Sequence, residues 1–595
     1  MIKERLRRLR ECMKKAGVTV YVIPSSDCHE SEYVCAHFRA REYMTGFSGS
    51  AGTAVITEEE AGLWTDGRYF VQAQMELAGT SVRLFKMEEP GVPDVETYVK
   101  EHLKAGGKLG FDGRTMSAFK AEKLKAAAEE KGAALLVTEN LVGAVWDDRP
   151  QLPKSRAFIL EEQWSGESTG NKLERVRKQM AEQGADIHVL ASLCDIAWIL
   201  NIRGRDIPHV PVVLSFLSVT KDTCTWYVDG SALSDRVQRH LKENGIKVKG
   251  YEEIYTDLRG VKDGQKVWLD KKSVNYRLLY AVPEKARILN QSNPSELMKA
   301  VKNPTEIQNL KAAHLKESLA FTRFMYWLKS NVHKEEITEI SAAAYLDHLR
   351  EEQGNYLEQS FAPICAYGSH GAIVHYSATE ESNTRILPEG FLLVDAGGHY
   401  REGTTDTTRT FALGALTEEQ KRMYTAVCRG NLKLASARFL YGCTGYNLDI
   451  LCREPLWQLG MDYKHGTGHG VGHLLNVHEG PNAFRWKLKD GGTPAALEPG
   501  MVTTDEPGIY IKDRYGIRLE NELLCVKQEE NKYGQFLGFE VLTLVPFDLD
   551  AILPQEMTQA EREYLNRYHQ TVYDALAPHL NEEERAWLKD YTRKI

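Results

Sequence analysis

The sequence has no long apolar run and no basic cluster. No stretch approaches the roughly 18–20 apolar residues that a membrane-spanning helix needs, and residues 1–17 carry charges every few positions, which predicts an amphipathic helix and not a signal peptide. Lys and Arg number 75 against 83 Asp and Glu, a formal net charge of −8 with both signs mixed along the chain. We therefore expect neither a membrane nor a nucleic-acid partner, because sequence-independent nucleic-acid binding needs clustered basic residues.

Cysteine is scarce and irregularly placed. The ten cysteines of this 595-residue chain form no CxxC pair and no repeated spacing, which argues against a disulfide scaffold. Reduced thiols and a cytoplasmic location are therefore expected. Hydrophobic residues make up 42% of the chain, enough for about three or four domains to bury a core each, and this composition excludes a disordered protein.

Two segments 167 residues apart share one pattern of helix, turn and strand. In each, three apolar positions on one helical face precede a glycine that can end the helix: Leu6, Leu9, Met13 and Gly17, then Leu173, Val176, Met180 and Gly184. A strand is predicted after each glycine, at 18–23 and 185–190, and an Asp-Gly turn follows later in both copies. A helix, a glycine and a strand recur in many α/β proteins, but four matching offsets and the shared turn favour a duplicated domain.

Two breaks in the pattern divide the chain. Residues 147–153 contain two prolines three positions apart, and residues 303–306, Asn-Pro-Thr-Glu, have the composition of a helix start. We predict a multidomain α/β (α+β) fold with a first domain at 1–150, its repeat at 151–299 and a larger domain at 300–595.

Two acids of the third domain stand in strand-like surroundings. Asp395 ends the apolar run of residues 391–394, where a lone buried carboxylate would be costly, and Asp406 follows eleven residues later among threonines. This separation suits adjacent strands of a hairpin, which would bring both acids to one site. Each acid alone is more often a turn or cap residue, so it is the pair that indicates a ligand site.

A glycine-rich segment with four histidines spans residues 465–478. His465 and His469 have the i, i+4 spacing of a helical zinc site, but the interleaved glycines disfavour a helix by about 1 kcal/mol each relative to alanine, and no glutamate follows His465. The segment also lacks the GxxxxGK(S/T) pattern of a phosphate-binding loop. We predict a loop or strand whose backbone approaches a ligand, and we assign His473 a structural role.

The last two segments supply glutamates. Glu506 precedes Pro507, which favours an extended conformation at Glu506. In residues 517–522, the side chains of Arg518 and Glu520 are predicted to point to the same side of a strand. An arginine is therefore expected to steady a glutamate there.

The candidate residues amount to four carboxylates and one imidazole: Asp395, Asp406, His469, Glu506 and Glu520. Four like charges do not converge without compensation, and two divalent cations would balance a charge of −4. The pattern therefore predicts a dinuclear metal site, and ligation dominated by oxygen favours manganese over a thiolate-type zinc site. Two such ions, about 3.5–4 Å apart, share a water or hydroxide that is a nucleophile at neutral pH.

These motifs resemble the metal-dependent aminopeptidase P (Xaa-Pro aminopeptidase) family, within peptidase family M24, whose catalytic domain has the pita-bread fold. The likeness is carried by residues 66–68, 375–376, 394–397, 404–409, 465–478, 506–508 and 518–521. The two repeated domains are similar to the creatinase-like domains of the long, three-domain cytosolic form.

By position, the resemblance implies that Asp395 chelates one metal ion, that Asp406 and Glu520 bridge both, and that His469 and Glu506 bind the other. Glu506 is also implied as the proton acceptor for the bridging water, since a carboxylate at that place lies within reach of the proton. The implied cofactors are two divalent ions per subunit, Mn²⁺ first, with Zn²⁺ or Co²⁺ as substitutes. The implied assembly is a homodimer formed through the C-terminal domain.

The resemblance also implies a set of substrate-binding residues: Arg68 of the first domain, His375, His465 and His478, with Arg518 and Tyr510 supporting them. Of these, His375 and His478 are implied in catalysis, because they match histidines that stabilise the tetrahedral intermediate.

The implied reaction is hydrolysis of the bond between an N-terminal residue and a following proline, by attack of a hydroxide held by the two metal ions. Proline has no N–H and restricts φ, so that peptidase sites which grip this N–H fail on it. Two alternatives stay open. One is a prolidase, which shares the ligand set but cleaves dipeptides, and the other is a metal-free peptide-binding module of the same fold, which the five retained ligands disfavour.

Overall fold

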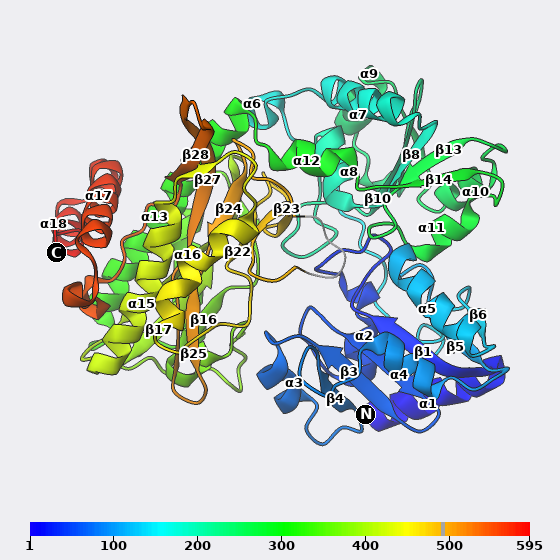
Figure 1. Ribbon diagram of the computed structural model, residues 1–595, viewed down its shortest axis with the longest axis horizontal. Coiled ribbons are helices and arrows are strands. Elements are labelled where there is room, and N and C mark those ends of the chain that lie inside the picture. The colour runs from blue at the N-terminus through cyan, green and yellow to red at the C-terminus, as the bar shows by residue number, and fades with distance from the viewer. Residues whose placement is uncertain (489–493) are drawn as a thin grey trace. The chain divides into compact units, whose positions relative to one another are not determined.

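The computed structural model describes residues 1–488 and 494–595 and divides the chain into two compact units (Figure 1). The first unit comprises residues 1–161 and 167–295, and the second comprises 162–166 and 296–595. Both units mix helices and sheets, as predicted. Within the described residues, no helix combines the length and the apolar character that crossing a membrane requires.

The first unit contains two six-stranded sheets with equivalent strand orders. One runs β4 (Arg83–Lys86), β3 (Ala61–Thr65), β2 (Thr53–Thr57), β1 (Val18–Pro24), β5 (Lys108–Gly110) and β6 (Ala134–Leu136). The other runs β12 (Ile246–Lys249), β11 (Cys224–Val228), β10 (Ser215–Thr220), β8 (Ile187–Leu190), β13 (Lys266–Leu269) and β14 (Arg287–Asn290). In both sheets two antiparallel pairs lie inside and parallel pairs lie outside. The predicted duplication is confirmed.

Matching helices precede the two first strands. α1 (Ile2–Ala16) and α7 (Thr169–Gln183) end on glycines with positive φ, 70° at Gly17 and 62° at Gly184, a conformation that costs other residues energy. Their buried faces hold the predicted apolar triplets: Leu6, Leu9 and Met13 in α1, and Leu173, Val176 and Met180 in α7. The apolar face predicted for residues 1–17 therefore packs against a core.

The remaining elements of the first unit are short. They are α2 (Ala40–Thr45), α3 (Phe70–Glu76), α4 (Val95–His102), α5 (Ala118–Glu130), β7 (Phe158–Ile159), α8 (Leu193–Leu200), β9 (Ile202–Arg203), α9 (Asp235–Glu243), α10 (Glu253–Arg259) and α11 (Tyr276–Ala281). α12 (Pro294–Ala300) spans the boundary between the units.

Within its described residues, the second unit has four sheets. Their strand orders are β15-β18-β19, β16-β17-β20, β21-β28-β27-β24-β22-β23 and β25-β26. The strands are β15 (Tyr356–Gln359), β16 (Ile364–Tyr367), β17 (Phe391–Ala396), β18 (Gly398–Tyr400), β19 (Gly403–Thr404), β20 (Thr407–Ala412), β21 (Phe439–Leu440), β22 (Gly468–Gly470), β23 (Glu479–Phe484), β24 (Val502–Asp505), β25 (Gly508–Ile511), β26 (Tyr515–Arg518), β27 (Asn521–Asn531) and β28 (Gly534–Val541).

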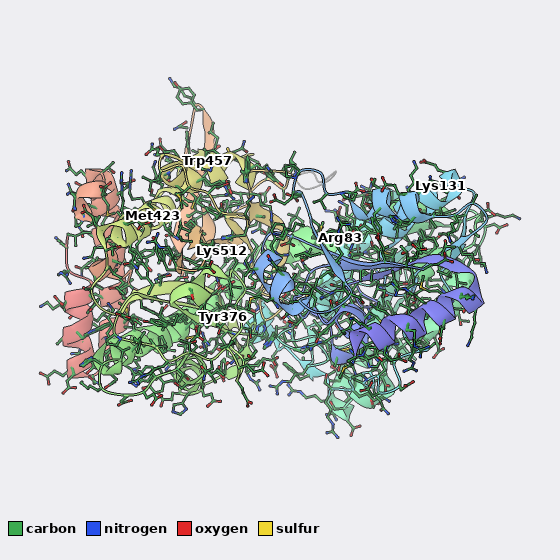
Figure 2. All side chains as sticks on the ribbon, turned by 90° about the horizontal axis from the view of Figure 1, so that it is seen from below. Arg83, Lys131, Tyr376, Met423, Trp457 and Lys512 are labelled. Carbon is green, nitrogen blue, oxygen red and sulfur yellow. The ribbon has the colours of Figure 1, made fainter. Side chains whose placement is uncertain are left out.

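The helices of this unit are α6 (Glu162–Ser165), α13 (Pro304–Asn331), α14 (Glu339–Glu351), α15 (Glu418–Ala435), α16 (Gly445–Trp457), α17 (Gln559–Leu576) and α18 (Glu582–Tyr591). α13 starts as predicted, because Asn303 and Glu306 form a reciprocal capping box around Pro304. Trp457, labelled in Figure 2, ends α16 and stays 41% exposed.

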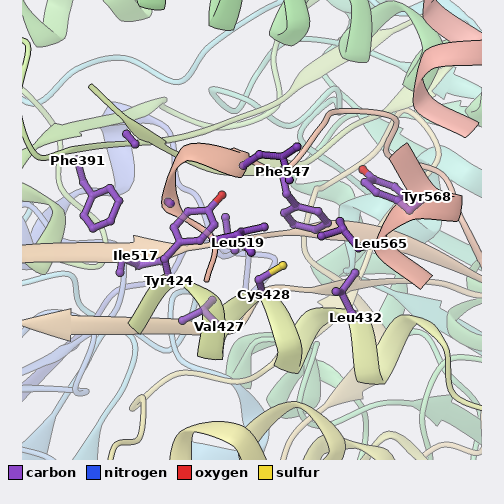
Figure 3. Packing of buried hydrophobic residues seen from close by; sticks show 14 of the residues in the cluster. Phe391, Tyr424, Val427, Cys428, Leu432, Ile517, Leu519, Phe547, Leu565 and Tyr568 are labelled. Carbon is purple, nitrogen blue, oxygen red and sulfur yellow. The ribbon is translucent and has the colours of Figure 1, made fainter. Parts of the chain in front are cut away.

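One core of the second unit joins α15 and α17 to β26 (Figure 3). Tyr424 and Cys428 of α15 pack in the same buried cluster as Leu565 of α17 and Ile517 of β26. A fully buried Leu or Ile side chain contributes about 1.5–3 kcal/mol. α17 is therefore part of the core that supports β26 and the residues that follow it.

His569 of α17 makes the stability of this core depend on pH. Its ring is buried and Nε2 accepts the N–H of Phe547 at 3.1 Å. Burial, aided by the charges of Arg409 and Arg593, lowers the pKa of His569 from 6.5 to about 3. As the pH falls, the unfolded chain binds this proton first, so the stability that is present above pH 6.5 is lost between pH 6.5 and 3.

We expect the contribution of His569 to the free energy of unfolding to fall by about 1.4 kcal/mol for each pH unit as the pH drops from 6.5 to 4. Urea unfolding of the native protein and of His569→Gln at a series of pH values measures this contribution as the difference between the two. His569→Gln keeps an acceptor for the Phe547 N–H, cannot take up a proton, and should therefore lack this part of the pH dependence. His348→Gln, at a side chain that is 61% exposed, is the control. An unchanged profile in His569→Gln would contradict the prediction.

Candidate metal centre

The five candidate ligands come from five strands or strand ends of the second unit. Asp395 lies in β17, Asp406 directly precedes β20, and His469 is the middle residue of β22. Glu506 lies between β24 and β25, and Glu520 lies between β26 and β27. Since β17 pairs with β20, and β24 pairs with both β22 and β27, the sheets bring these segments together.

Three of these side chains form a compact group. Asp406, His469 and Glu520 each offer a ligand atom that lies within 4.8 Å of the other two. Nε2 of His469 is 3.5 Å from Oδ2 of Asp406 and 3.6 Å from Oε1 of Glu506. This group has the size and the donor types of a metal site.

The site brings several carboxylates close together. Burial raises the pKa of Asp406 and Glu520 well above the usual carboxyl range, and the neighbouring charges of Asp395 and Glu506 raise both further. Oδ1 of Asp395 and Oδ1 of Asp406 are buried, yet within residues 1–488 and 494–595 neither atom has a hydrogen-bond partner. Buried carboxylate oxygens without partners, in a group of crowded acids, need a compensating cation, so the residues present fit a pair of divalent ions.

Neighbouring groups orient two of the candidate ligands. Nδ1 of His469 lies 3.0 Å from the carbonyl of Gly470, which assigns the proton to Nδ1 and leaves Nε2 as an acceptor toward the acids. Oγ1 of Thr408 donates to Oε2 of Glu520 at 2.7 Å. Both contacts turn lone pairs toward the common centre.

Arg518 pairs with Asp395 and not with a glutamate, so the predicted partner is wrong. Nη2 of Arg518 lies 2.5 Å from Oδ2 of Asp395. The single strand predicted over residues 517–522 is two strands, because β26 ends at Arg518 and β27 begins at Asn521 in a different sheet. This change of sheet removes the regular alternation and directs Arg518 toward β17.

Tyr510 connects Arg518 to His465. Its hydroxyl accepts from Nη1 of Arg518 at 2.8 Å and lies 2.8 Å from Nε2 of His465. Because Nδ1 of His465 faces the Gly466 carbonyl at 2.7 Å, Nε2 is the acceptor and Tyr510 is the donor. Burial raises the pKa of Tyr510 to about 12, which keeps this proton on the hydroxyl.

Of the two histidines predicted to act in catalysis, His478 lies beside His469, and His375 follows a residue that contacts Arg518. The ring of His478 stands edge-on to that of His469, with centroids 4.3 Å apart. His375 directly follows Val374, whose carbonyl lies 3.4 Å from Nη1 of Arg518. Their predicted roles stay predictions.

Arg68 belongs to the first unit. It lies in the turn after β3, where Nη2 donates to Oδ2 of Asp66 at 2.8 Å. Its role in substrate binding stays a prediction.

Two further expectations about the backbone need correction. β17 and β20 are adjacent strands, with Asp395 opposite Thr408, but they are not a simple hairpin, because β18 and β19 intervene and form another sheet, in which β18 pairs with both β15 and β19. Residues 468–470 are a strand, one of the forms predicted. Their glycines admit a neighbouring strand, however, because a Cβ at Gly468 would lie 1.8 Å from the carbonyl oxygen of Thr504.

The sequence did not predict a buried pair of side chains, Glu522 and His314, next to Asp406. Oε1 of Glu522 accepts the N–H of Asp406 at 2.7 Å, and Oε2 lies 3.1 Å from Nε2 of His314 on α13. Both side chains are fully buried. Glu522 was visible as a polar position in an apolar strand, but nothing in the sequence relates it to a histidine in a distant helix.

Comparisons with known families cover most of the chain. Residues 308–527 match metallopeptidase family M24, and residues 535–595 match the C-terminal region of peptidase M24. Residues 5–144 and 148–306 each match the creatinase/prolidase N-terminal domain. The predicted fold class, two creatinase-like domains followed by a pita-bread domain, is therefore confirmed.

Proteins that are similar over nearly the whole chain belong to the same family. A probable Xaa-Pro aminopeptidase P of Botryotinia fuckeliana is 39% identical over 586 residues, 96% of this chain and 89% of the relative, and Xaa-Pro aminopeptidase 1 of Dictyostelium discoideum is 35% identical, covering 100% and 97%. The crystal structure of X-prolyl aminopeptidase from Caenorhabditis elegans, described as a cytosolic enzyme with a di-nuclear active site, is 33% identical over the whole of both chains, with a TM-score of 0.95. The chain belongs to the Xaa-Pro aminopeptidase family within metallopeptidase family M24.

Proposed function

We propose that the protein is a metal-dependent aminopeptidase that releases the N-terminal residue from peptides with proline at the second position. The observation that carries this function is the convergence of Asp406, His469 and Glu520 on one centre, in a chain whose full-length relatives are Xaa-Pro aminopeptidases. The same three residues argue against a metal-free binding module, which would not need to retain them.

Five residues would hold the two cations: Asp395, Asp406, His469, Glu506 and Glu520. We propose Mn²⁺ as the ion, with Zn²⁺ or Co²⁺ as substitutes, because a site with four carboxylates and one imidazole favours hard cations. When bound, two such ions supply Lewis acidity and lower the pKa of water to near neutrality.

The chain's own groups handle the proton and the substrate. Oε1 of Glu506 takes the proton of the attacking water and passes it to the proline nitrogen as that nitrogen leaves. His375 and His478 donate to the substrate carbonyl oxygen, on which negative charge develops. His465, Tyr510 and Arg518 complete the substrate site proposed in the second unit, and a role in substrate binding is proposed for Arg68 from its position in the sequence alone.

The test of function is cleavage of Arg-Pro-Pro and the dipeptide Ala-Pro side by side, with Mn²⁺ and with a chelator. Release of arginine from the tripeptide, abolished by the chelator and restored by metal, is expected. Cleavage of Ala-Pro alone would mean a prolidase, and cleavage of neither would mean a binding module.

Further proposals concern assembly and location. We propose a homodimer formed through the second unit, because Trp457, Trp486 and Leu488 there are 41%, 46% and 60% exposed and the two tryptophan rings lie 5.7 Å apart. A monomeric mass in solution at micromolar concentration would overturn the proposed homodimer.

We also propose a cytoplasmic location, which is supported by the relative described as cytosolic. The proposed division of the chain is into three domains, at 1–150, 151–299 and 300–595.

Tyr510→Phe is expected to lower kcat/KM on Arg-Pro-Pro by about fivefold to tenfold. The change removes two hydrogen bonds of the hydroxyl, the one donated to Nε2 of His465 and the one accepted from Nη1 of Arg518, and leaves the ring packing in place. Steady-state kinetics measure the loss, and His465→Ala tests its route: because Tyr510 acts partly through His465, adding Tyr510→Phe to that variant has a smaller effect. Equal losses in both backgrounds would contradict the prediction.

A further inference from the structure

The loop of residues 367–384 carries His375 and lies around the carboxylate of Glu339. Glu339 is the first residue of α14 and is fully buried. The loop runs from the end of β16 through a short 3-10 helix (Gly368–Ala372) and returns to the start of α14. It contributes none of the five candidate metal ligands.

The Glu339 carboxylate collects four donors from this loop. Oε1 accepts the N–H of Tyr367 at 2.8 Å and faces Nδ1 of His370 at 2.8 Å. Oε2 accepts the hydroxyl of Tyr376 at 2.9 Å and the N–H of Thr384 at 3.2 Å. A carboxylate has about four acceptor positions, so all of them are used. Within the described residues, the hydrogen bonds of this carboxylate go to the loop alone.

These bonds fix the loop on both sides of His375. Tyr367 and Thr384 stand at the two ends of the loop. Tyr376, which is labelled in Figure 2, follows His375 in the chain. The ring of Tyr376 stacks on that of His370, with centroids 4.5 Å apart. The residue before His375 is held from the other side, because its carbonyl faces Arg518. Both neighbours of His375 are therefore held in place, Val374 by its carbonyl, which contacts Arg518, and Tyr376 by its hydroxyl, which binds Glu339.

We propose that Glu339 is a positioning residue that sets the place of His375 for substrate binding. The inference rests on the proposed function, in which His375 contacts the substrate. A carboxylate suits the task, because each of its oxygens accepts one backbone N–H and one side-chain donor. The N-terminus of α14, where Glu339 lies, favours a negative charge.

A variant without the charge separates this role from a merely structural one. Glu339→Gln replaces one oxygen with an NH₂ group, so that two loop donors lose their acceptor. If Glu339 acts through His375, the loss of kcat/KM disappears once His375 is absent. A residue that only stabilises the fold would cause the same loss in both backgrounds.

The experiment measures kcat/KM on Arg-Pro-Pro for the Mn²⁺-loaded full chain, for Glu339→Gln, for His375→Ala and for the double variant. We expect Glu339→Gln to lower kcat/KM about tenfold in the native background and less than twofold in the His375→Ala background. Calorimetric titration of the metal-free proteins with Mn²⁺ should give the same affinity for Glu339→Gln as for the native chain. Equal losses in both backgrounds, or a loss of Mn²⁺ affinity that accounts for the lower activity, would overturn the proposal.

Two further variants keep the test decisive. Tyr376→Phe removes one donor and leaves the charge, so it should show a smaller loss, about threefold, with the same dependence on His375 even if Glu339→Gln fails to fold. Glu317→Gln is the matched control, since Glu317 is also fully buried but binds Arg350 and Tyr400, away from the loop. Any loss that it causes should be equal in both backgrounds. An inactive native protein would defeat the proposed function itself, whereas additive losses in an active protein would defeat only the role of Glu339.

Discussion

Glu506→Gln is expected to lower kcat on a peptide with proline at position two by about 10²–10⁴-fold, while the protein stays folded. Glutamine keeps the shape of the side chain and an oxygen that can face a cation. It cannot accept the proton of the attacking water. The main chain should not move, because the N–H of residue 506 remains bonded to the carbonyl of Thr467 at 2.8 Å.

Three measurements separate this effect from damage to the site. Steady-state kinetics give kcat, thermal unfolding reports the fold, and calorimetric titration with Mn²⁺ reports the metal. Glu498→Gln is the matched control, because Glu498 lies shortly before β24 and its carboxylate accepts from the Tyr441 hydroxyl at 2.8 Å. Its kcat should equal that of the native protein. Near-normal turnover by Glu506→Gln would remove Glu506 from the mechanism.

The parts of the fold that could be predicted from the sequence are governed by local chemistry. Gly17 and Gly184 end their helices because a left-handed residue is needed there, and Asn303 with Glu306 starts α13 because the first N–H groups of a helix need acceptors. Each signal acts within a few residues. The repeat was therefore readable, and the identical strand orders of the two sheets followed from it.

The candidate site was predictable for a different reason. Four acids embedded in apolar or threonine-rich segments are hard to explain singly, and together they require positive charge. Charge balance does not depend on how the chain is folded, so the sequence indicated all four acids together. The structure brings a ligand atom of Asp406 and one of Glu520 within 4.8 Å of each other and of His469, and their role as metal ligands stays a prediction. Their exact partners depend on tertiary structure and were not accessible in this way.

The partner of Arg518 shows where prediction from the sequence ends. Residues 517–522 read as one strand, since apolar and polar positions alternate from Ile517 to Glu520. The structure divides them between a two-stranded and a six-stranded sheet, and this division depends on β25 and β24, which are the strands available to pair. Pairing between strands is set by the whole unit, so the same pattern is compatible with either arrangement.

Removal of divalent cations is expected to destabilise the second unit, and the destabilisation should grow as the pH rises from about 5 to 8. In the metal-free protein, burial and then the adjacent acids raise the pKa of Asp406 and Glu520 above their ordinary values of 3.8 and 4.5. The native state then holds protons that the unfolded chain releases. Its free energy of unfolding therefore falls as the pH rises above the ordinary carboxyl range.

Cations reverse this trend, because they bind the ionised carboxylates of the native state and add about 2.7 kcal/mol when present at 100 times their dissociation constant. The difference in melting temperature between Mn²⁺-loaded and chelated protein should thus be smallest near pH 5 and widen toward pH 8. Thermal unfolding at four pH values measures it, and Asp406→Asn should narrow the difference, because that variant removes one of the crowded charges and one metal ligand together. A difference that stays constant with pH would mean that the charges of the neighbouring acids do not affect Asp406 and Glu520. Charge balance would then no longer require two cations.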